Sequence, residues 1–322
     1  MNILRRRGWE IPQREATPEE YFFDRRKFMQ AAAAAGASIA LPALPAFAQG
    51  ADPSAGLYPA KRNEAYKIDR DITAEEHASR YNNFFEFGGD KDVYKLVESL
   101  RTRPWMIRID GMVDKPFEIG IDDLLKKVQL EERVYRLRCV EAWGMTVPWT
   151  GFPMSKLVEI CAPKADAKYI RIETFLDPKI APGQRQAWYP WPYVEGCTVQ
   201  EAMNELSFMV IGVYGKPLGK QYGAPIRLHM PWKYGFKASK SIQRITFTNE
   251  RPKSFWETLQ AAEYGFWANV NPRVPHPRWG QDTEIVLGAP GMKRVDTLMW
   301  NGYGEYVAGL YKGLEKTEQL FM

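Results

Sequence analysis

The sequence has 322 residues, 45% of them hydrophobic and 26% charged, which is the composition of an ordinary globular protein with a sizeable core. Its formal net charge of +5 at pH 7 is mild, and no basic run is interleaved with aromatic residues, which argues against a nucleic-acid partner. The sequence also lacks GxSxG, Walker, GxGxxG and CxxC patterns, and so lacks the signatures of the common hydrolase, nucleotide-binding and dithiol classes.

The first 48 residues have the pattern of a bacterial export signal. The pair Arg25-Arg26 precedes an uncharged, Ala-rich run at 31–41, and the segment 42–48 ends in the small-x-small pattern that signal peptidase requires. The arginine pair indicates the twin-arginine route. A membrane-anchoring helix is the alternative, but Pro42 and Pro45 interrupt a run that is too weakly apolar for a permanent span.

This signal predicts both the domain organisation and the location. We expect a twin-arginine signal peptide at 1–48 and a single domain at 49–322, working in the periplasm. Because this route carries folded proteins, it favours a bulky cofactor that is inserted before export. The signal contains seven Lys/Arg and five Asp/Glu, which leaves about +3 of the +5 on the mature chain, a charge that suits an anionic cofactor.

The mature chain predicts an α+β domain with a mixed sheet. We expect an extended or partly helical arm at 49–80, followed by an aromatic, amide-rich loop at 81–88. Alternating or continuous apolar patterns predict strands at 105–111, 133–138, 169–174, 208–214, 226–230 and 243–248. Amphipathic patterns predict helices at 121–128, 153–161 and 198–206, the last capped by Thr198. The segment 251–300 has little periodicity and is predicted to form packed loops.

Three cysteines are an odd number for an oxidising compartment, so at least one stays unpaired. Cys161 is predicted on the apolar face of a helix and Cys197 in a loop beside Thr198, and we expect structural roles for both. The histidines at 77, 229 and 276 are too far apart in the sequence to indicate a zinc-type cluster.

Cys139 is the candidate metal ligand. It follows the predicted strand 133–138 and is preceded by Arg136 and Arg138, whose positive charge should favour the thiolate form. A thiolate suits a soft or high-valent metal. A lone cysteine at the end of a strand is, however, more often a buried structural residue, so this pattern alone leaves the choice open.

Several segments carry a resemblance to a known family. The stretch Arg138-Cys139-Val140-Glu141-Ala142-Trp143 resembles the molybdenum-ligating segment of the sulfite-oxidase superfamily, and 231–237 resembles the loop that closes over its pterin. Further matching segments are 81–84, 193–196, 269–272, 276–279 and 301–303. Together, and over nearly the whole mature chain, they resemble the catalytic subunits of periplasmic protein-methionine-sulfoxide reductases. The resemblance implies a sulfite-oxidase-like fold with mixed β-sheets and short helices.

The resemblance also implies a set of site residues. Cys139 would be the protein ligand of molybdenum in a molybdenum-molybdopterin cofactor, one per chain. The residues that would contact the cofactor are Asn82, Phe85, Glu86, Thr174, Tyr222, Arg227, Ala238, Ser239 and Lys240. The tail of the cofactor is anionic, so the positive charges of Arg227 and Lys240 are an independent physical reason to expect that they bind it. Two positions depart from the family pattern, since relatives have Tyr at the position of Phe85 and Asn at that of Tyr222.

The implied activity is the reduction of methionine sulfoxide in oxidised periplasmic proteins, with electrons from a membrane haem-binding subunit fed by quinol. The resemblance implies a monomeric catalytic subunit. Two alternatives stay open at this stage. Sulfite oxidation by a related enzyme would need a positively charged pocket, and the arginine-rich composition is compatible with one. A non-catalytic exported binding protein would bury Cys139 without a metal.

Overall fold

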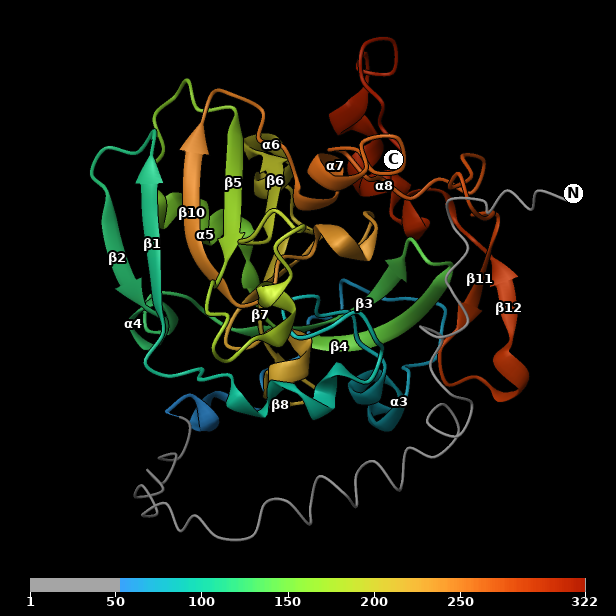
Figure 1. Cartoon of the computed structure of the whole chain (residues 1–322), viewed down its shortest axis with the longest axis horizontal. Helices are drawn as coiled ribbons and strands as arrows, with labels where there is room; N and C mark the ends of the chain where they lie inside the picture. The colour runs from blue at the N-terminus through green and yellow to red at the C-terminus, as the bar shows by residue number, and fades with distance from the viewer. Residues whose placement is uncertain (1–52, 322) are drawn as a thin grey trace, which may run out of the picture. The chain divides into compact units, whose positions relative to one another are not determined.

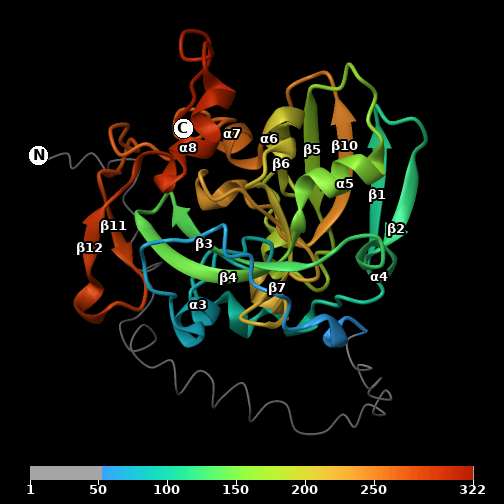
Figure 2. The ribbon, with the colours of Figure 1, turned by 180° about the vertical axis from the view of Figure 1, so that it is seen from behind.

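The computed structural model describes residues 53–321, so the predicted signal at 1–48 lies outside the described residues. One sheet has five strands in the order β2-β1-β10-β5-β6, in which β1 and β10 are parallel and the other neighbours antiparallel. Its strands are β1 (Met106–Gly111), β2 (Phe117–Gly120), β5 (Tyr169–Thr174), β6 (Val194–Thr198) and β10 (Ile242–Thr248). They stand side by side in Figure 1, and α5 (Met154–Cys161) crosses one face of the sheet in Figure 2.

The second sheet has the path β12-β11-β4-β7-β8, with β3 paired to β4 and β9 paired to β7. Its strands are β3 (Glu131–Cys139), β4 (Trp143–Pro153), β7 (Phe208–Val213), β8 (Lys216–Pro217), β9 (Arg227–His229), β11 (Thr283–Val286) and β12 (Arg294–Asp296). The pair β11–β4 is parallel and the other pairs are antiparallel, which makes both sheets mixed. The predicted α+β fold with mixed sheets and short helices is thus confirmed.

Short helices connect these strands. The α-helices are α3 (Glu75–Arg80), α4 (Ile121–Leu125), α5, α6 (Val199–Met203), α7 (Phe255–Leu259) and α8 (Gly304–Val307). The single-turn 3-10 helices are η2 (Ala55–Leu57), η3 (Val93–Lys95), η4 (Val97–Ser99), η5 (Pro182–Arg185), η6 (Lys220–Tyr222), η7 (Gly235–Lys237), η8 (Pro290–Met292), η9 (Met299–Gly302) and η10 (Ala308–Tyr311). Thr198 caps α6 through a capping box with Glu201, as the sequence predicts. Among residues 53–321, no helix is long and apolar enough to cross a bilayer.

The predicted strands and helices are all present, with ends that differ by a few residues. The prediction that the segment 251–300 consists of loops was wrong. This segment contains α7, β11 and β12. No strand was predicted at the position of β4, the longest strand. Every residue of β4 except Pro153 is buried, so it shows no alternation, and its Gly and Pro residues are typical of loops.

Cys197 lies on β6 and not in the predicted loop, whereas Cys161 ends α5 on its buried face, as expected. Both side chains are buried and neither forms a disulfide. Burial raises the pKa of the Cys161 thiol to about 12, and it raises that of Cys197 as well. These two cysteines therefore behave as core residues.

The hairpin of β3 and β4 positions the candidate site. Its register pairs Glu131 with Gly151 at one end and Cys139 with Trp143 at the other. Trp149 on β4 is fully buried, and its ring lies against those of Tyr222 and His229. This aromatic packing anchors the hairpin in the core and holds its turn in a fixed place.

His229 predicts a pH dependence of stability. Burial, and then the charge of Arg227, lower the pKa of His229 to about 3, so the folded protein excludes the imidazolium form. The unfolded chain takes up this proton below about pH 6.5. The contribution of His229 to stability is therefore present above that pH and is lost as the pH falls from 6.5 toward 3.

We expect His229→Leu to reduce the loss of stability between pH 7 and pH 4.5 by about 2 to 3 kcal/mol relative to the parent chain. Urea unfolding at the two pH values measures this difference. An equal loss in both proteins would contradict the assignment.

Candidate active site

A cavity of about 520 Å³ lies at the end of the β3–β4 hairpin. Its walls come from segments that are far apart in the sequence, and many of them are aromatic. The lining residues are Tyr81, Asn82, Asn83, Phe85, Glu86, Leu137, Cys139, Val140, Glu141, Trp143, Met145, Tyr193, Gln221, Arg227, Gly235, Phe236, Ala238, Lys240, Trp256, Tyr264, Arg278 and Trp279. A volume of this size accommodates a ligand of several hundred daltons.

Cys139 is the last residue of β3, and its side chain lines the cavity. Because successive strand residues point to opposite faces, Leu137 also lines the cavity, whereas the guanidinium groups of Arg136 and Arg138 bind partners away from it. The charge of Arg138 acts to lower the pKa of Cys139, as expected, but other effects outweigh it. Burial and the charge of Glu141 raise the pKa of Cys139 to about 12, and Arg138 opposes this only in part. A bound metal ion would be the group that deprotonates this thiol.

A polar cluster surrounds the sulfur of Cys139. Glu141 Oε2 lies 3.6 Å from the sulfur, and Asn83 Nδ2 lies 3.5 Å from it. The same Glu141 oxygen accepts hydrogen bonds from Lys91 Nζ at 2.5 Å and Trp143 Nε1 at 2.9 Å. Burial acts to raise the pKa of Glu141, but the hydrogen bonds from Lys91 and Trp143 outweigh it and lower the pKa. A carboxylate is therefore fixed beside the sulfur.

Two cations of the cavity wall have no carboxylate partner among residues 53–321. Arg227 is 3% exposed, and its only hydrogen-bond acceptors in this part of the chain are the carbonyl oxygens of Tyr222 and Leu228. Burial, and then the charge of Arg227, lower the pKa of Lys240 to about 7, although Glu86 opposes this effect. A buried arginine and the repulsion between it and Lys240 are unfavourable without an anion. This end of the cavity is suited to an anionic ligand.

The aromatic loop contributes Asn82, Phe85 and Glu86 to the cavity wall. The Glu86 carboxylate accepts a hydrogen bond of 2.7 Å from Thr174 Oγ1, and burial raises the pKa of Glu86. Thr174 does not line the cavity, and it contacts a residue that does, Glu86. Phe85 packs its ring edgewise on Trp256 at 4.8 Å between ring centroids.

Three further candidates lie in the segments 220–223 and 237–241. Ala238 lines the cavity, whereas Tyr222 and Ser239 are buried behind it. Gln221 lines the cavity in place of Tyr222, whose carbonyl oxygen supports Arg227. Thus seven of the ten candidate residues share one cavity wall, and Thr174, Tyr222 and Ser239 do not reach its surface.

Sequence reasoning missed several residues of this site. Asn83 and Glu141 belong to segments that carried the resemblance, but their roles beside the sulfur depend on the hairpin turn. Lys91 comes from a segment with no motif, and only the fold brings it to Glu141. The aromatic wall from 256–279 belongs to the segment predicted as loops.

The donor set fits a metal held by an anionic organic ligand. Among residues 53–321, no group of three or more His, Cys, Asp and Glu side chains could hold a metal ion by itself. The sulfur of Cys139 can supply one soft ligand, so the remaining ligands must come from a bound molecule. Asn82 Oδ1, a buried atom of the cavity wall without a hydrogen-bond partner in this part of the chain, is a further contact for such a molecule or its ordered water.

Comparison with known proteins identifies the family. Residues 94–256 match the family model described as the oxidoreductase molybdopterin binding domain. The chain is 45% identical over 315 residues to the protein-methionine-sulfoxide reductase catalytic subunit MsrP of Burkholderia mallei, covering 96% of this chain and 95% of that protein. It is 46% identical over 322 residues to MsrP of Pseudomonas syringae pv. tomato, covering 93% of this chain and 94% of that protein.

A solved structure with a detectable likeness is the sulfane dehydrogenase SoxCD from Paracoccus pantotrophus, with a TM-score of 0.45 and 16% identity over 78% of this chain and 67% of that chain. The family assignment rests on the sequence matches, which extend over nearly the full length. The chain belongs to the family of molybdopterin-binding protein-methionine-sulfoxide reductase catalytic subunits.

Proposed function

We propose that this protein reduces methionine sulfoxide to methionine in oxidised periplasmic proteins, using a molybdenum-molybdopterin cofactor. The observation that carries the proposal is the position of Cys139, whose sulfur faces a cavity also lined by the cations Arg227 and Lys240, which form no ion pair among residues 53–321. The two relatives named above, at 45% and 46% identity, carry this activity in their names.

The residues of the cavity suit the separate parts of such a cofactor. Cys139 would hold the metal through its sulfur, and Arg227 and Lys240 would bind the anionic tail by charge-assisted hydrogen bonds. Asn82 lines the cavity, and its Oδ1, which has no hydrogen-bond partner among residues 53–321, could contact the pterin. When bound, the cofactor supplies the oxygen-atom and two-electron chemistry.

The chain itself prepares the surroundings of the metal. Glu141 lies beside the Cys139 sulfur, and Lys91 and Trp143 fix its carboxylate, so a charged oxygen is held at a constant position near the reacting atoms. The aromatic wall, which includes Trp256 and Trp279, excludes water and offers ring surfaces to a thioether. Such a wall suits a methionine side chain before and after reduction.

The proposal extends to the location and the partners. Residues 1–48 act as a twin-arginine signal peptide, and residues 49–322 form the single oxidoreductase domain exported folded to the periplasm. Methionine oxidation is a reversible lesion to which exported proteins are exposed. The relatives are named as catalytic subunits, which supports a partner subunit as the source of electrons, and we propose a membrane haem-binding protein fed by quinol. The catalytic subunit itself would be a monomer.

Replacing Cys139 tests the metal ligand. We expect Cys139→Ala to remove molybdenum from the purified protein and to abolish the reduction of methionine sulfoxide by a chemical electron donor, because the variant lacks the sulfur ligand. Cys161→Ala is the matched control, since Cys161 is also buried and unpaired but lies outside the cavity. Elemental analysis and a turnover assay on the same samples give the result.

An unchanged molybdenum content in Cys139→Ala would refute the assignment of the ligand. Rapid sulfite oxidation by the parent protein, with no sulfoxide reduction, would instead refute the proposed substrate.

Replacing Lys240 tests the anionic end of the cavity. Lys240→Met should weaken retention of the cofactor by about 10- to 100-fold, because the variant loses a charged hydrogen-bond donor. Since the pKa of Lys240 in the cofactor-free chain is about 7, the protonated form that binds anions is lost as the pH rises through this value. The difference between parent and variant should therefore shrink above about pH 7.

Pterin fluorescence after oxidative release measures the retained cofactor. Lys220→Met is the control, because Lys220 pairs with Glu98 at the surface and does not line the cavity. Equal retention in parent and Lys240→Met at pH 6 would show that Lys240 does not bind the cofactor.

A further inference from the structure

The turn that carries Cys139 has a strained backbone. Cys139 ends β3 and Trp143 begins β4, so only three residues connect the two strands. The turn is closed by a hydrogen bond of 3.2 Å from Ala142 N to Cys139 O, and Ala142 has a φ of 60°. A non-glycine residue in the left-handed region costs about 1 kcal/mol, so the surrounding structure must hold this turn in place.

Side chains from two segments hold both carbonyl groups at the start of this turn. The guanidinium group of Arg138 donates to the carbonyl oxygen of Cys139 through Nη1. The carbonyl oxygen of Val140 accepts two hydrogen bonds of 2.7 Å, one from Trp279 Nε1 and one from Gln281 Nε2. The peptide group on each side of Val140 is therefore fixed by groups from outside the turn.

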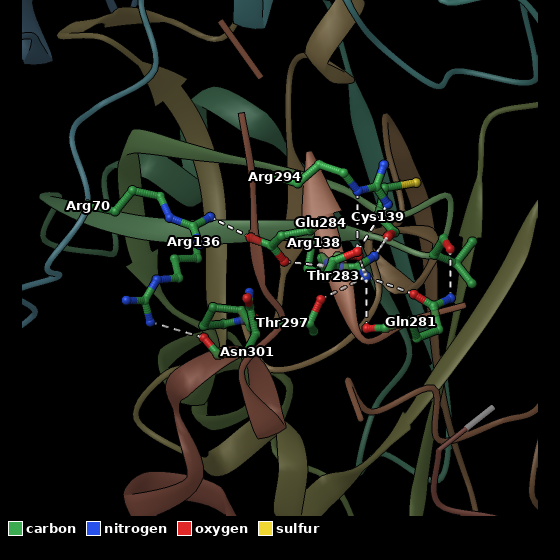
Figure 3. Close-up of polar contacts among 12 residues, drawn as sticks. Arg70, Arg136, Arg138, Cys139, Gln281, Thr283, Glu284, Arg294, Thr297 and Asn301 are labelled. Carbon is green, nitrogen blue, oxygen red and sulfur yellow. Dashed lines mark hydrogen bonds and ion pairs between the residues drawn. The ribbon is translucent and has the colours of Figure 1, made fainter. Parts of the chain in front are cut away.

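Arg138 is itself held on all sides (Figure 3). Its Nε lies 2.7 Å from Glu284 Oε2, and its Nη2 donates to Gln281 Oε1 at 2.8 Å and to Thr297 Oγ1 at 3.2 Å. The side chains of Arg138 and Glu284 are 0% and 2% exposed, and Arg70 binds the other oxygen of Glu284 at 2.5 Å. These contacts restrict the orientation of the guanidinium group.

This buried network is poorly explained by stability alone. Removing two charges from water costs several kcal/mol per ion, and a buried ion pair is often no more stable than an apolar replacement. The backbone makes room for the network, because a Cβ on Gly144 would lie 2.9 Å from Glu284 Oε1. What the network supplies is a fixed geometry for the residue beside it.

We propose that Arg138, held by Glu284 and Gln281, is a positioning residue that sets where the Cys139 sulfur lies relative to the molybdenum. The proposal rests on the proposed function, because it assigns Cys139 as the metal ligand. Groups that orient a ligand without touching the metal commonly affect metal binding or activity by about 10- to 100-fold. Here the orientation acts through the backbone of the turn, and the guanidinium group contacts neither metal nor substrate.

The test compares Arg138→Lys and Gln281→Met with the control Arg133→Lys. A lysine keeps the charge beside Glu284 but cannot bind the Cys139 carbonyl and Gln281 together. Gln281→Met leaves the Arg138–Glu284 pair intact, so it serves if the first variant fails to fold. Arg133 is also buried on β3 and pairs with Glu131, at the end of the strand away from Cys139.

Two readouts report on the sulfur itself. In the loaded protein, the Mo(V) electron paramagnetic resonance spectrum depends on the metal–sulfur geometry. In the full chain produced without molybdenum, the rate of Cys139 alkylation by iodoacetamide, followed by peptide mass spectrometry, depends on how firmly the turn holds the thiol. We expect both site variants to shift the spectrum, to speed alkylation and to lower turnover by about 10- to 100-fold, with Arg133→Lys resembling the parent.

Spectra and alkylation rates that match the parent in both site variants would overturn the positioning role, even if turnover falls. Equal changes in Arg133→Lys would also overturn it, because they would reflect general destabilisation. A parent protein without molybdenum would refute the proposed function. The alkylation rates would still test whether Arg138 and Gln281 fix the position of the Cys139 thiol.

Discussion

The alternation of side chains along β3 is the constraint on which the site depends. It directs the Cys139 sulfur into the cavity and the Arg138 guanidinium into the buried network with Glu284. A shift of the strand by one residue would exchange these two environments, placing a cation in the cavity and a thiol among buried charges. The long pairing of β3 with β4, and the burial of Trp149 between aromatic rings, prevent such a shift.

The cavity has properties that make sense only with a ligand. The thiol of Cys139 has a raised pKa, Arg227 and Lys240 share a buried wall without a carboxylate partner in the described chain, and Asn82 has a free carbonyl oxygen. The buried Arg227 cation and the Asn82 oxygen each cost free energy without a partner. A soft metal with an anionic organic ligand resolves them together, since the metal stabilises the thiolate and the anion stabilises the cations. This is the chemistry of the family to which the chain belongs.

Local patterns predicted much of the fold. The strand at 169–174 and the cap at Thr198 followed from alternation and capping chemistry, which depend on neighbouring residues alone. β4 could not be found in this way, because burial on both faces removes its alternation. Cys139 lines the cavity, but the sequence could not show that burial outweighs the effect of Arg138 on the pKa of its thiol, because burial depends on the folded chain. Lys91 and Gln281 required the folded chain, because only tertiary contacts bring them to the cysteine turn.

The bond between the Cys139 sulfur and molybdenum is the central claim, and X-ray absorption at the molybdenum edge measures it most directly. In the parent, we predict a metal surrounded by the two sulfurs of the pterin and a third sulfur from the chain. The third sulfur should be absent from any molybdenum that Cys139→Ser retains through its hydroxyl oxygen, and should be kept in Cys161→Ser. A metal that shows the same sulfur shell in the parent and in Cys139→Ser would contradict it.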